Sequence, residues 1–416
     1  MTELFDQSVL AVRPQPLGVF PLPLGYLLIE ASPTTEAARS ELLAGRLPQW
    51  PPALRAQELA LAGDRDAALA LLTGSDPISR YNRFVMDPDG VDVDELRSSL
   101  GEFGVLVDVV LFVLGRSDTA PALGAATGEI AAVVMSVQAA RALQDGDIAA
   151  AIELLLHAGE QAAELCEPLR GVLIGAAASV SEGPAAIERF EQAVAALAGA
   201  DDLRLPRAEL HLALAGLVHE EAVERPELLN SAVRHYHCTL QLILREEDPL
   251  TWAAAHANLA SAYLTMPMIE ASDQLRLGVA VQSLRSALKV YTPVEYPEQW
   301  ASVQLNLANS LVYTPSSHQL ENLVEAANLY EEVLAARDRS TDPLGRARVL
   351  ANQGNVLAHL GEFDQAKAKL YEARSLFEEF QDHDAVRTVR GVLDEIARQQ
   401  ALTRTGAKSA GDHGGQ

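Results

Sequence analysis

Lysine is the scarcest charged residue in this sequence, and it occurs only at positions 289, 367, 369 and 408. Carboxylates outnumber basic side chains, with 57 Asp plus Glu against 32 Lys plus Arg, so the formal net charge is −25. A nucleic-acid surface needs a concentrated basic patch that releases counterions, and an anionic membrane attracts the same kind of patch. The composition therefore predicts that the chain binds neither nucleic acid nor a membrane.

Cysteine is equally rare, because only Cys166 and Cys238 occur and neither belongs to a C-x-x-C pair. This spacing excludes a disulfide framework and a zinc motif, and it suits a reducing compartment. Residues 1–7 contain no Lys or Arg, so we expect no secretory signal. We therefore expect a cytoplasmic location.

Long apolar runs are also missing. The run over residues 19–29 is broken by Pro21 and Pro23, and the run over residues 105–114 contains Asp108. A membrane-spanning helix needs about 20 apolar residues, so both runs are better explained as a buried strand or helix.

Aromatic side chains make up 5% of the residues although 49% are hydrophobic, so Ala, Leu and Val must fill the interior. Such side chains suit closely packed helices. Changes in local composition along the chain predict four regions: a Pro-rich extended segment over residues 1–45, a helical region with degenerate hairpins over 46–204, a tandem helical array over 205–400, and a disordered tail over 401–416.

Internal self-similarity is the strongest pattern, and it is clearest after residue 205. Four segments align as first helices: AELHLALAGL (208–217), AHANLASAYL (255–264), VQLNLANSLV (303–312) and LANQGNVLAH (350–359). The alignment places two columns, one of His211, Asn258, Asn306 and Asn352, and one of Ala213, Ala260, Ala308 and Gly354. A second helix in each unit repeats a small residue and, four residues later, a large one: Ala232 and Tyr236, Ala280 and Leu284, Ala326 and Tyr330, Ala366 and Leu370.

This pattern predicts a repeated helix hairpin. The small residues let the two helices approach closely, and the large residue one turn later fills the space beside the neighbouring unit. A single hairpin cannot bury its apolar face, so the units must stack, which predicts an all-α solenoid with a concave surface.

The final unit, with Gly354, LGEFDQA (360–366), Leu370 and Ala373, resembles the tetratricopeptide repeat, whose frame is roughly 34 residues. Residues 249–263 and 297–311 resemble a longer-loop variant found in bacterial arrays. Parts of the frame recur at 58–72, 133–162 and 183–197, whereas 79–128 departs from it. The resemblance implies a right-handed superhelical solenoid whose groove binds a peptide of another protein.

The asparagines of the first helices are the main candidate site. In related arrays, an Asn at this position points into the groove and grips the main chain of a bound peptide, since its amide both donates and accepts. The alternative is that these amides bond neighbouring helices. The candidate peptide-binding residues are Asn258, Ser261, Asn306, Asn309, Tyr313, Arg348, Asn352 and Asn355, with Gln304, Gln353 and His359 around them.

Metal and catalytic signatures are weak or missing. RHYHC (234–238) offers His235, His237 and Cys238, but residues i and i+2 of a helix diverge by about 200°, so the two imidazoles need help from another helix to meet one ion. The sequence has no G-x-x-x-x-G-K-[ST], H-E-x-x-H or G-x-S-x-G motif. We therefore expect no enzyme, no catalytic residue, no metal and no cofactor.

The sequence thus predicts a non-enzymatic scaffold or adaptor that binds a peptide segment of a partner protein, in complex assembly or regulation. Two alternatives stay open: a regulatory receptor for a small signalling peptide, and an assembly chaperone for a multisubunit enzyme. A homo-oligomer is a further possibility, because the apolar residues 1–45 need burial against their own chain or a second copy.

Overall fold

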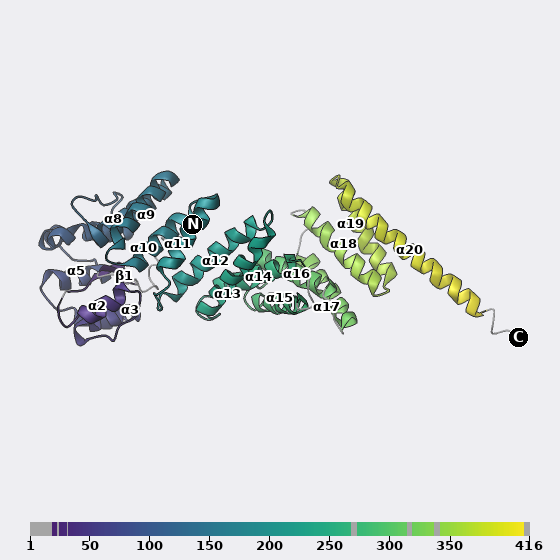
Figure 1. The fold of residues 1–416 in the computed structure, drawn as a ribbon, viewed down its shortest axis with the longest axis horizontal. Helices are drawn as coiled ribbons and strands as arrows, with labels where there is room; N and C mark the ends of the chain where they lie inside the picture. The colour runs from purple at the N-terminus through teal and green to yellow at the C-terminus, as the bar shows by residue number, and fades with distance from the viewer. Residues whose placement is uncertain are drawn as a thin grey trace. The chain divides into compact units, whose positions relative to one another are not determined.

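The computed structural model describes residues 19–22, 25–30, 32–267, 273–313, 318–336 and 342–411, and within these ranges it describes the side chains of all residues except 19–22, 25–26, 273–274 and 403–411. The chain forms two compact units, Met1–Leu244 and Arg245–Gln416. Almost all regular structure in these residues is helical, and consecutive helices pack as antiparallel pairs within each unit (Figure 1). The all-α prediction is confirmed in this form, and the helix pairing is consistent with a helical repeat.

The described part of unit 1 begins with a small β-hairpin, whose strands are β1 (Val19–Leu22) and β2 (Gly25–Leu28). The strands pair antiparallel, with Val19 opposite Leu28. At the end of β2 the chain buries three consecutive apolar side chains, Leu27, Leu28 and Ile29, and β2 contacts α5 and α7. These three side chains are therefore buried against their own chain, whereas the side chains of residues 1–26 lie outside the described residues.

The rest of the predicted extended segment is not wholly extended, because helix α2 (Glu36–Leu43) lies inside it. After α2 the chain is fastened to a distant part of unit 1. The Asp202 backbone N–H donates to the Gly45 carbonyl at 3.2 Å, and the Asp202 carboxylate accepts from the Leu47 N–H at 2.6 Å. The buried Cys166 thiol donates to the Leu43 carbonyl at 3.2 Å, which gives this cysteine a structural role.

Short helices follow, and their starts match local sequence signals. Asp64, Asp76 and Asp92 each accept a backbone N–H from the first turn of the next helix, as N-cap residues do. The elements are η2 (Pro52–Leu54), α3 (Arg55–Leu61), α4 (Arg65–Leu71), α5 (Pro77–Met86), α6 (Val93–Ser99), η3 (Gly101–Gly104) and α7 (Val105–Val113). The apolar run at 105–114 is thus a buried helix.

Longer helices complete unit 1: α8 (Gly128–Gln144), α9 (Ile148–Ala163), α10 (Glu167–Ser179), α11 (Gly183–Ala196), α12 (Arg204–Glu221) and α13 (Leu229–Leu242), with η4 (Pro226–Leu228) before the last. The hairpin predicted at 133–162 is present as α8 and α9, which turn at Gly146 with φ +81°. Its predicted core residues are fully buried: Ala139, Ala151, Leu155 and Ala158.

Unit 2 contains α14 (Pro249–Thr265), α15 (Asp273–Ala287), α16 (Pro297–Tyr313), α17 (Gln319–Ala336), α18 (Pro343–His359), α19 (Phe363–Glu379) and α20 (His383–Gly411). The first helices α14, α16 and α18 each begin at a proline, which has no N–H to leave unpaired there. Asp248 and Asp342 cap two of these helices. The predicted tail starts inside α20, which continues to Gly411.

Burial confirms the second-helix columns at every unit, because each predicted small residue and each large partner is buried. In the first helices, Ala260, Ala308 and Gly354 are also buried. The prediction is wrong for α12: Ala213 is partly exposed, whereas Ala215 is fully buried. Ala215, and not Ala213, is therefore equivalent to Ala260, Ala308 and Gly354. The correct alignment of α12 with the other first helices is shifted by two residues from the one predicted from the sequence.

A Cβ added at Gly354 would lie 2.6 Å from the Leu370 Cγ. This contact shows why the last unit uses glycine where the others use alanine: α18 and α19 approach too closely for a larger side chain. Among the described residues, no helix is both long and apolar enough to cross a membrane.

Candidate functional site

The candidate asparagines lie on the first helices of unit 2. Helices α14, α16 and α18 contact one another in sequence order, so their predicted residues lie on neighbouring helices. The side chains differ in exposure: Asn258 and Arg348 are exposed, Tyr313 is 72% exposed, and the others are partly buried, namely Ser261, Asn306, Asn309, Asn352 and Asn355.

Two of these amides bond directly to each other. The Asn352 Nδ2 donates to the Asn309 Oδ1 at 3.1 Å, which joins α18 to α16. The hydroxyl of Tyr330, from α17, donates to the same Oδ1 at 2.6 Å. Burial raises the pKa of Tyr330, so its hydroxyl keeps the proton that this bond requires. Asn309 therefore accepts from two helices at once, and its amide orientation is fixed.

This arrangement leaves an amide nitrogen of Asn309 and an amide oxygen of Asn352 at the same junction. Within the described residues, the Asn309 Nδ2 donates to no group and the Asn352 Oδ1 accepts from none. A peptide group has one N–H and one C=O, which are the complements of these two atoms. Internal bonding and guest binding are thus compatible, because the internal bonds use only half of the amide pair.

Asn355 lies in a separate place, at a cleft of about 370 Å³ between α18 and α20. Its wall combines polar and apolar side chains from these two helices: Asn355, Ala358, His359, Thr388, Gly391, Val392, Glu395, Ile396 and Gln399. Asn352, at the junction, and Asn355, at the cleft, are one turn apart on α18.

Gln304 and Gln353 are not groove residues, contrary to the prediction. Both are buried, and both reach α17: the Gln304 Nε2 donates to Glu332 at 2.5 Å, and the Gln353 Nε2 donates to Glu331 at 2.8 Å. Lys369 donates to the same Glu331 carboxylate at 2.6 Å, and these bonds lower the Glu331 pKa. The two glutamines hold the first helices to α17.

The histidines of unit 1 form an arrangement that the sequence did not reveal. The Nδ1 atoms of His211 on α12 and His235 on α13 are 2.9 Å apart, so one ring donates a proton and the other accepts it. Burial, His235 and Arg207 together lower the His211 pKa to about 4. Among the described residues, no group of three or more His, Cys, Asp or Glu is placed to hold a metal ion.

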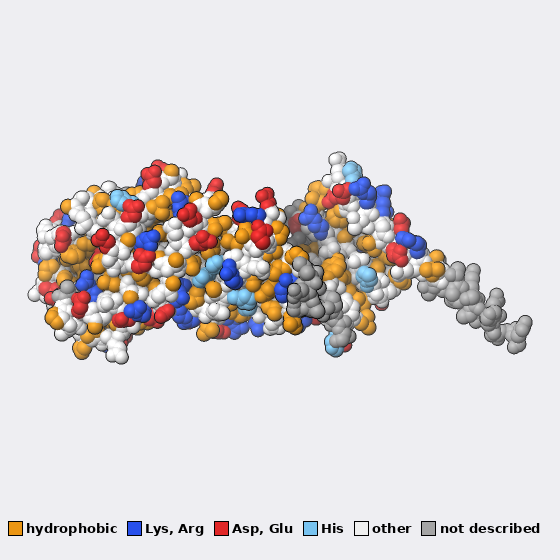
Figure 2. Space-filling model, viewed as in Figure 1, with side chains coloured by type: hydrophobic (Ala, Val, Ile, Leu, Met, Phe, Trp, Pro, Cys, Tyr) orange, Lys and Arg blue, Asp and Glu red, His pale blue; other side chains and the backbone are white. Residues whose placement is uncertain are grey.

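The visible surface carries both signs of charge. Figure 2 shows carboxylates and basic side chains interspersed over the face turned to the viewer, with exposed hydrophobic side chains between them. Most basic groups of the described residues are already in ion pairs, such as Arg346 with Glu372 and Arg285 with Glu325.

No protein-family model matches the chain, and a search of curated proteins returns no match. The fold defines a class, an all-α protein of consecutive helix hairpins. The resemblance to tetratricopeptide repeats depends on the repeat residues of this chain alone.

Proposed function

We propose that the chain is a non-enzymatic scaffold of the tetratricopeptide-like kind, in which unit 2 binds an extended peptide segment of a partner protein. The hairpins would stack as a right-handed superhelical solenoid, and the first helices α14, α16 and α18 would line its concave groove. This proposal requires no catalytic group and no cofactor.

The Asn309–Asn352 pair carries the proposal. Asn309 is held by Tyr330 and Asn352, so its remaining N–H groups point in a fixed direction. A donor that is already ordered loses little side-chain entropy when a guest binds, which favours capture of a peptide carbonyl. Main-chain recognition of this kind gives affinity, whereas pockets for side chains give specificity.

Residues around the pair supply such contacts. Asn258 and Asn306 occupy the same column on the neighbouring helices, Arg348 and Tyr313 are exposed, and the cleft at Asn355 has room for one side chain. A peptide with an acidic side chain near Arg348 would suit the one exposed guanidinium among these candidates.

Affinity purification from the native cell tests the proposal. Tagged wild-type chain should enrich a partner that the double variant Asn306→Ala, Asn352→Ala does not enrich, while circular dichroism shows the same helicity. Asn328→Ala is the matched control, because Asn328 is an exposed asparagine on α17 outside the candidate set. Equal enrichment by all three proteins would remove the groove from consideration.

A further inference from the structure

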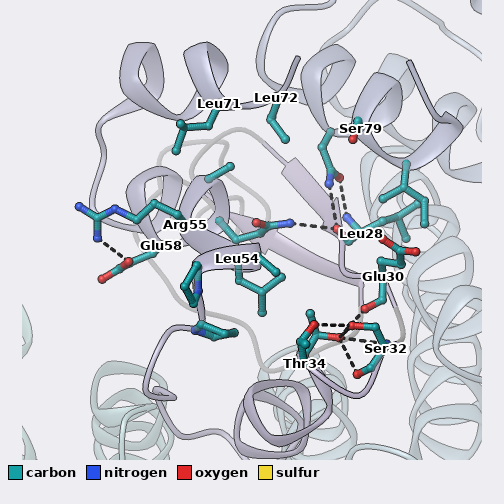
Figure 3. A pocket seen from close by; sticks show the side chains of 18 of the residues that line it. Leu28, Glu30, Ser32, Thr34, Leu54, Arg55, Glu58, Leu71, Leu72 and Ser79 are labelled. Atoms are coloured by element: carbon teal, nitrogen blue, oxygen red, sulfur yellow. Dashed lines mark hydrogen bonds and ion pairs between the residues drawn. The ribbon is translucent and has the colours of Figure 1, made fainter. Parts of the chain in front are cut away.

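A large pocket opens in unit 1, with a volume of about 820 Å³ (Figure 3). Volumes of about 300–1,000 Å³ are typical of sites for small organic ligands. Three parts of the chain form most of the wall: the end of β2 with the turn after it, residues 50–58, and the start of α5. Figure 3 shows Leu71 and Leu72 on one side of the space, Leu54 on another, and Leu28 with Glu30 on a third.

The wall contains a buried hydrogen-bond acceptor that the described residues do not satisfy. Gln57 is 6% exposed, and its Nε2 donates to the Leu28 carbonyl at 3.3 Å. Its Oε1 accepts from no described group. Exchanging the two amide atoms would set the oxygen against the Leu28 carbonyl, so the orientation is determined. A buried unpaired acceptor destabilises the fold, and an N–H or O–H donor from a ligand would satisfy it.

The charges in the wall favour a cation. Among the described residues of the wall, the carboxylates are Glu30, Glu58 and Asp76, and Arg55 is the basic group. Arg55 is paired with Glu58 at 2.5 Å, and Asp76 caps α5 by accepting from the Ser79 N–H. Glu30 is exposed and forms no ion pair with a described residue, so its charge is available to a ligand.

Trp50 adds an aromatic face to the same wall, and it is half-buried. An ammonium or guanidinium group is attracted to the face of an indole, and the attraction grows as the pair is desolvated. The net charge of −25 also raises the local concentration of cations around the protein.

We propose that this pocket binds an organic cation, an ammonium or guanidinium group carried on an apolar body. Glu30 and the Trp50 ring face the charge, the Gln57 Oε1 accepts one N–H, and Leu54, Leu71 and Leu72 contact the apolar body. The cation belongs either to a free amine or to a Lys or Arg side chain of a partner peptide. This site lies in unit 1 and uses none of the asparagines of the proposed peptide site.

Isothermal titration calorimetry on the full chain tests the charge requirement. The probes are 2-phenylethylammonium, its neutral analogue 2-phenylethanol, and the peptide acetyl-Phe-Arg-amide. The ammonium ion should bind at least about tenfold more tightly than the alcohol at low salt. Added salt should lower the affinity for the cation and leave the affinity for the alcohol unchanged. If the peptide binds more tightly than the amine, the natural ligand is a Lys or Arg side chain of a partner peptide. If the amine binds more tightly, the natural ligand is a free amine. Equal affinity for amine and alcohol, or no binding of any probe, would overturn the proposal.

Variants test the named contacts. Glu30→Gln should lower the affinity for 2-phenylethylammonium about tenfold and leave 2-phenylethanol unchanged. Glu102→Gln removes the same charge from an exposed residue outside the wall and should change neither. Trp50→Leu should lower the affinity for 2-phenylethylammonium, and Trp50→Phe should retain part of that affinity. Unchanged cation affinity in Glu30→Gln would contradict the assignment, whether or not the Trp50 variants fold.

Discussion

The side chain of Asn82 pairs with both backbone groups of Leu28. Its Oδ1 accepts from the Leu28 N–H at 2.7 Å, and its Nδ2 donates to the Leu28 carbonyl at 2.8 Å. A side-chain amide on α5 thus takes the place of a neighbouring strand at the edge of β2. This is the kind of main-chain recognition that we propose for a guest in unit 2, and here the chain applies it to itself.

Replacing Asn82 tests how strongly the hairpin is held. Asn82→Ala leaves the buried Leu28 N–H without a partner, which should cost about 1–3 kcal/mol of unfolding free energy, whereas the Leu28 carbonyl keeps its bond from the Gln57 Nε2. Urea unfolding followed by circular dichroism measures the loss. Asn230→Ala, at an exposed asparagine on α13, is the control and should change the midpoint little. A wild-type midpoint for Asn82→Ala would show that the pairing adds no stability.

The corrected alignment of α12 makes a second prediction. Ala215→Leu should destabilise unit 1 by about 1–3 kcal/mol, because the added side chain has no space between packed helices. Ala213→Leu should be nearly neutral, since Ala213 is partly exposed. Denaturant midpoints of the two variants, measured side by side, distinguish the alignments. The opposite order of stability would restore the alignment read from the sequence.

Two glycines of unit 2 should respond in opposite ways to the same substitution. Gly354→Ala brings a Cβ against Leu370 and the Ala366 carbonyl, so it should destabilise although alanine is the better helix former. Gly278→Ala, on α15, meets nothing within 4 Å and should gain roughly 0.5–1 kcal/mol. Thermal unfolding gives both signs, and a stabilising Gly354→Ala would contradict the close approach of α18 and α19.

The histidine pair predicts an acid-sensitive unit 1. The folded-state pKa of His211, about 4, lies below its ordinary value of 6.5. The unfolded chain therefore binds the proton more tightly, so stability is complete above pH 6.5 and falls as the pH drops from there towards 4. Urea midpoints between pH 7.5 and 4.5 should fall more for wild type than for His211→Gln. His359→Gln, at an exposed histidine, should follow the wild type.

The repetitive part of the fold could be predicted from the sequence because small residues recur in its core at similar intervals, of which the last is the shortest. Ala232, Ala280, Ala326 and Ala366 are all buried, and they carry the pattern by themselves. The alignment of His211 with Asn258, Asn306 and Asn352 was wrong because similarity of sequence does not ensure the same burial. Only the period of burial, set by Ala208 and Ala215, reveals the true alignment.

The polar contacts could be predicted only in part. Sequence spacing placed Asn309 and Asn352 on neighbouring helices, but their mutual bond depends on side-chain rotamers. Gln57 and Asn82 could not be singled out, since they gain their role from Leu28, which lies 29 and 54 residues away along the chain. Gln304 and Gln353 were misassigned to a groove because a buried glutamine bonded to glutamate has no distinct sequence pattern.

The attachment of the N-terminal segment has a consequence for synthesis on the ribosome. Leu47 precedes the carboxylate that accepts from its N–H by 155 residues, and Leu28 precedes Asn82 by 54. The first apolar strand therefore emerges long before the groups that fasten it have been translated. During that interval the apolar residues Leu27, Leu28 and Ile29 of the nascent chain lack these partners. Folding of unit 1 can be completed only after Asp202 has left the exit tunnel.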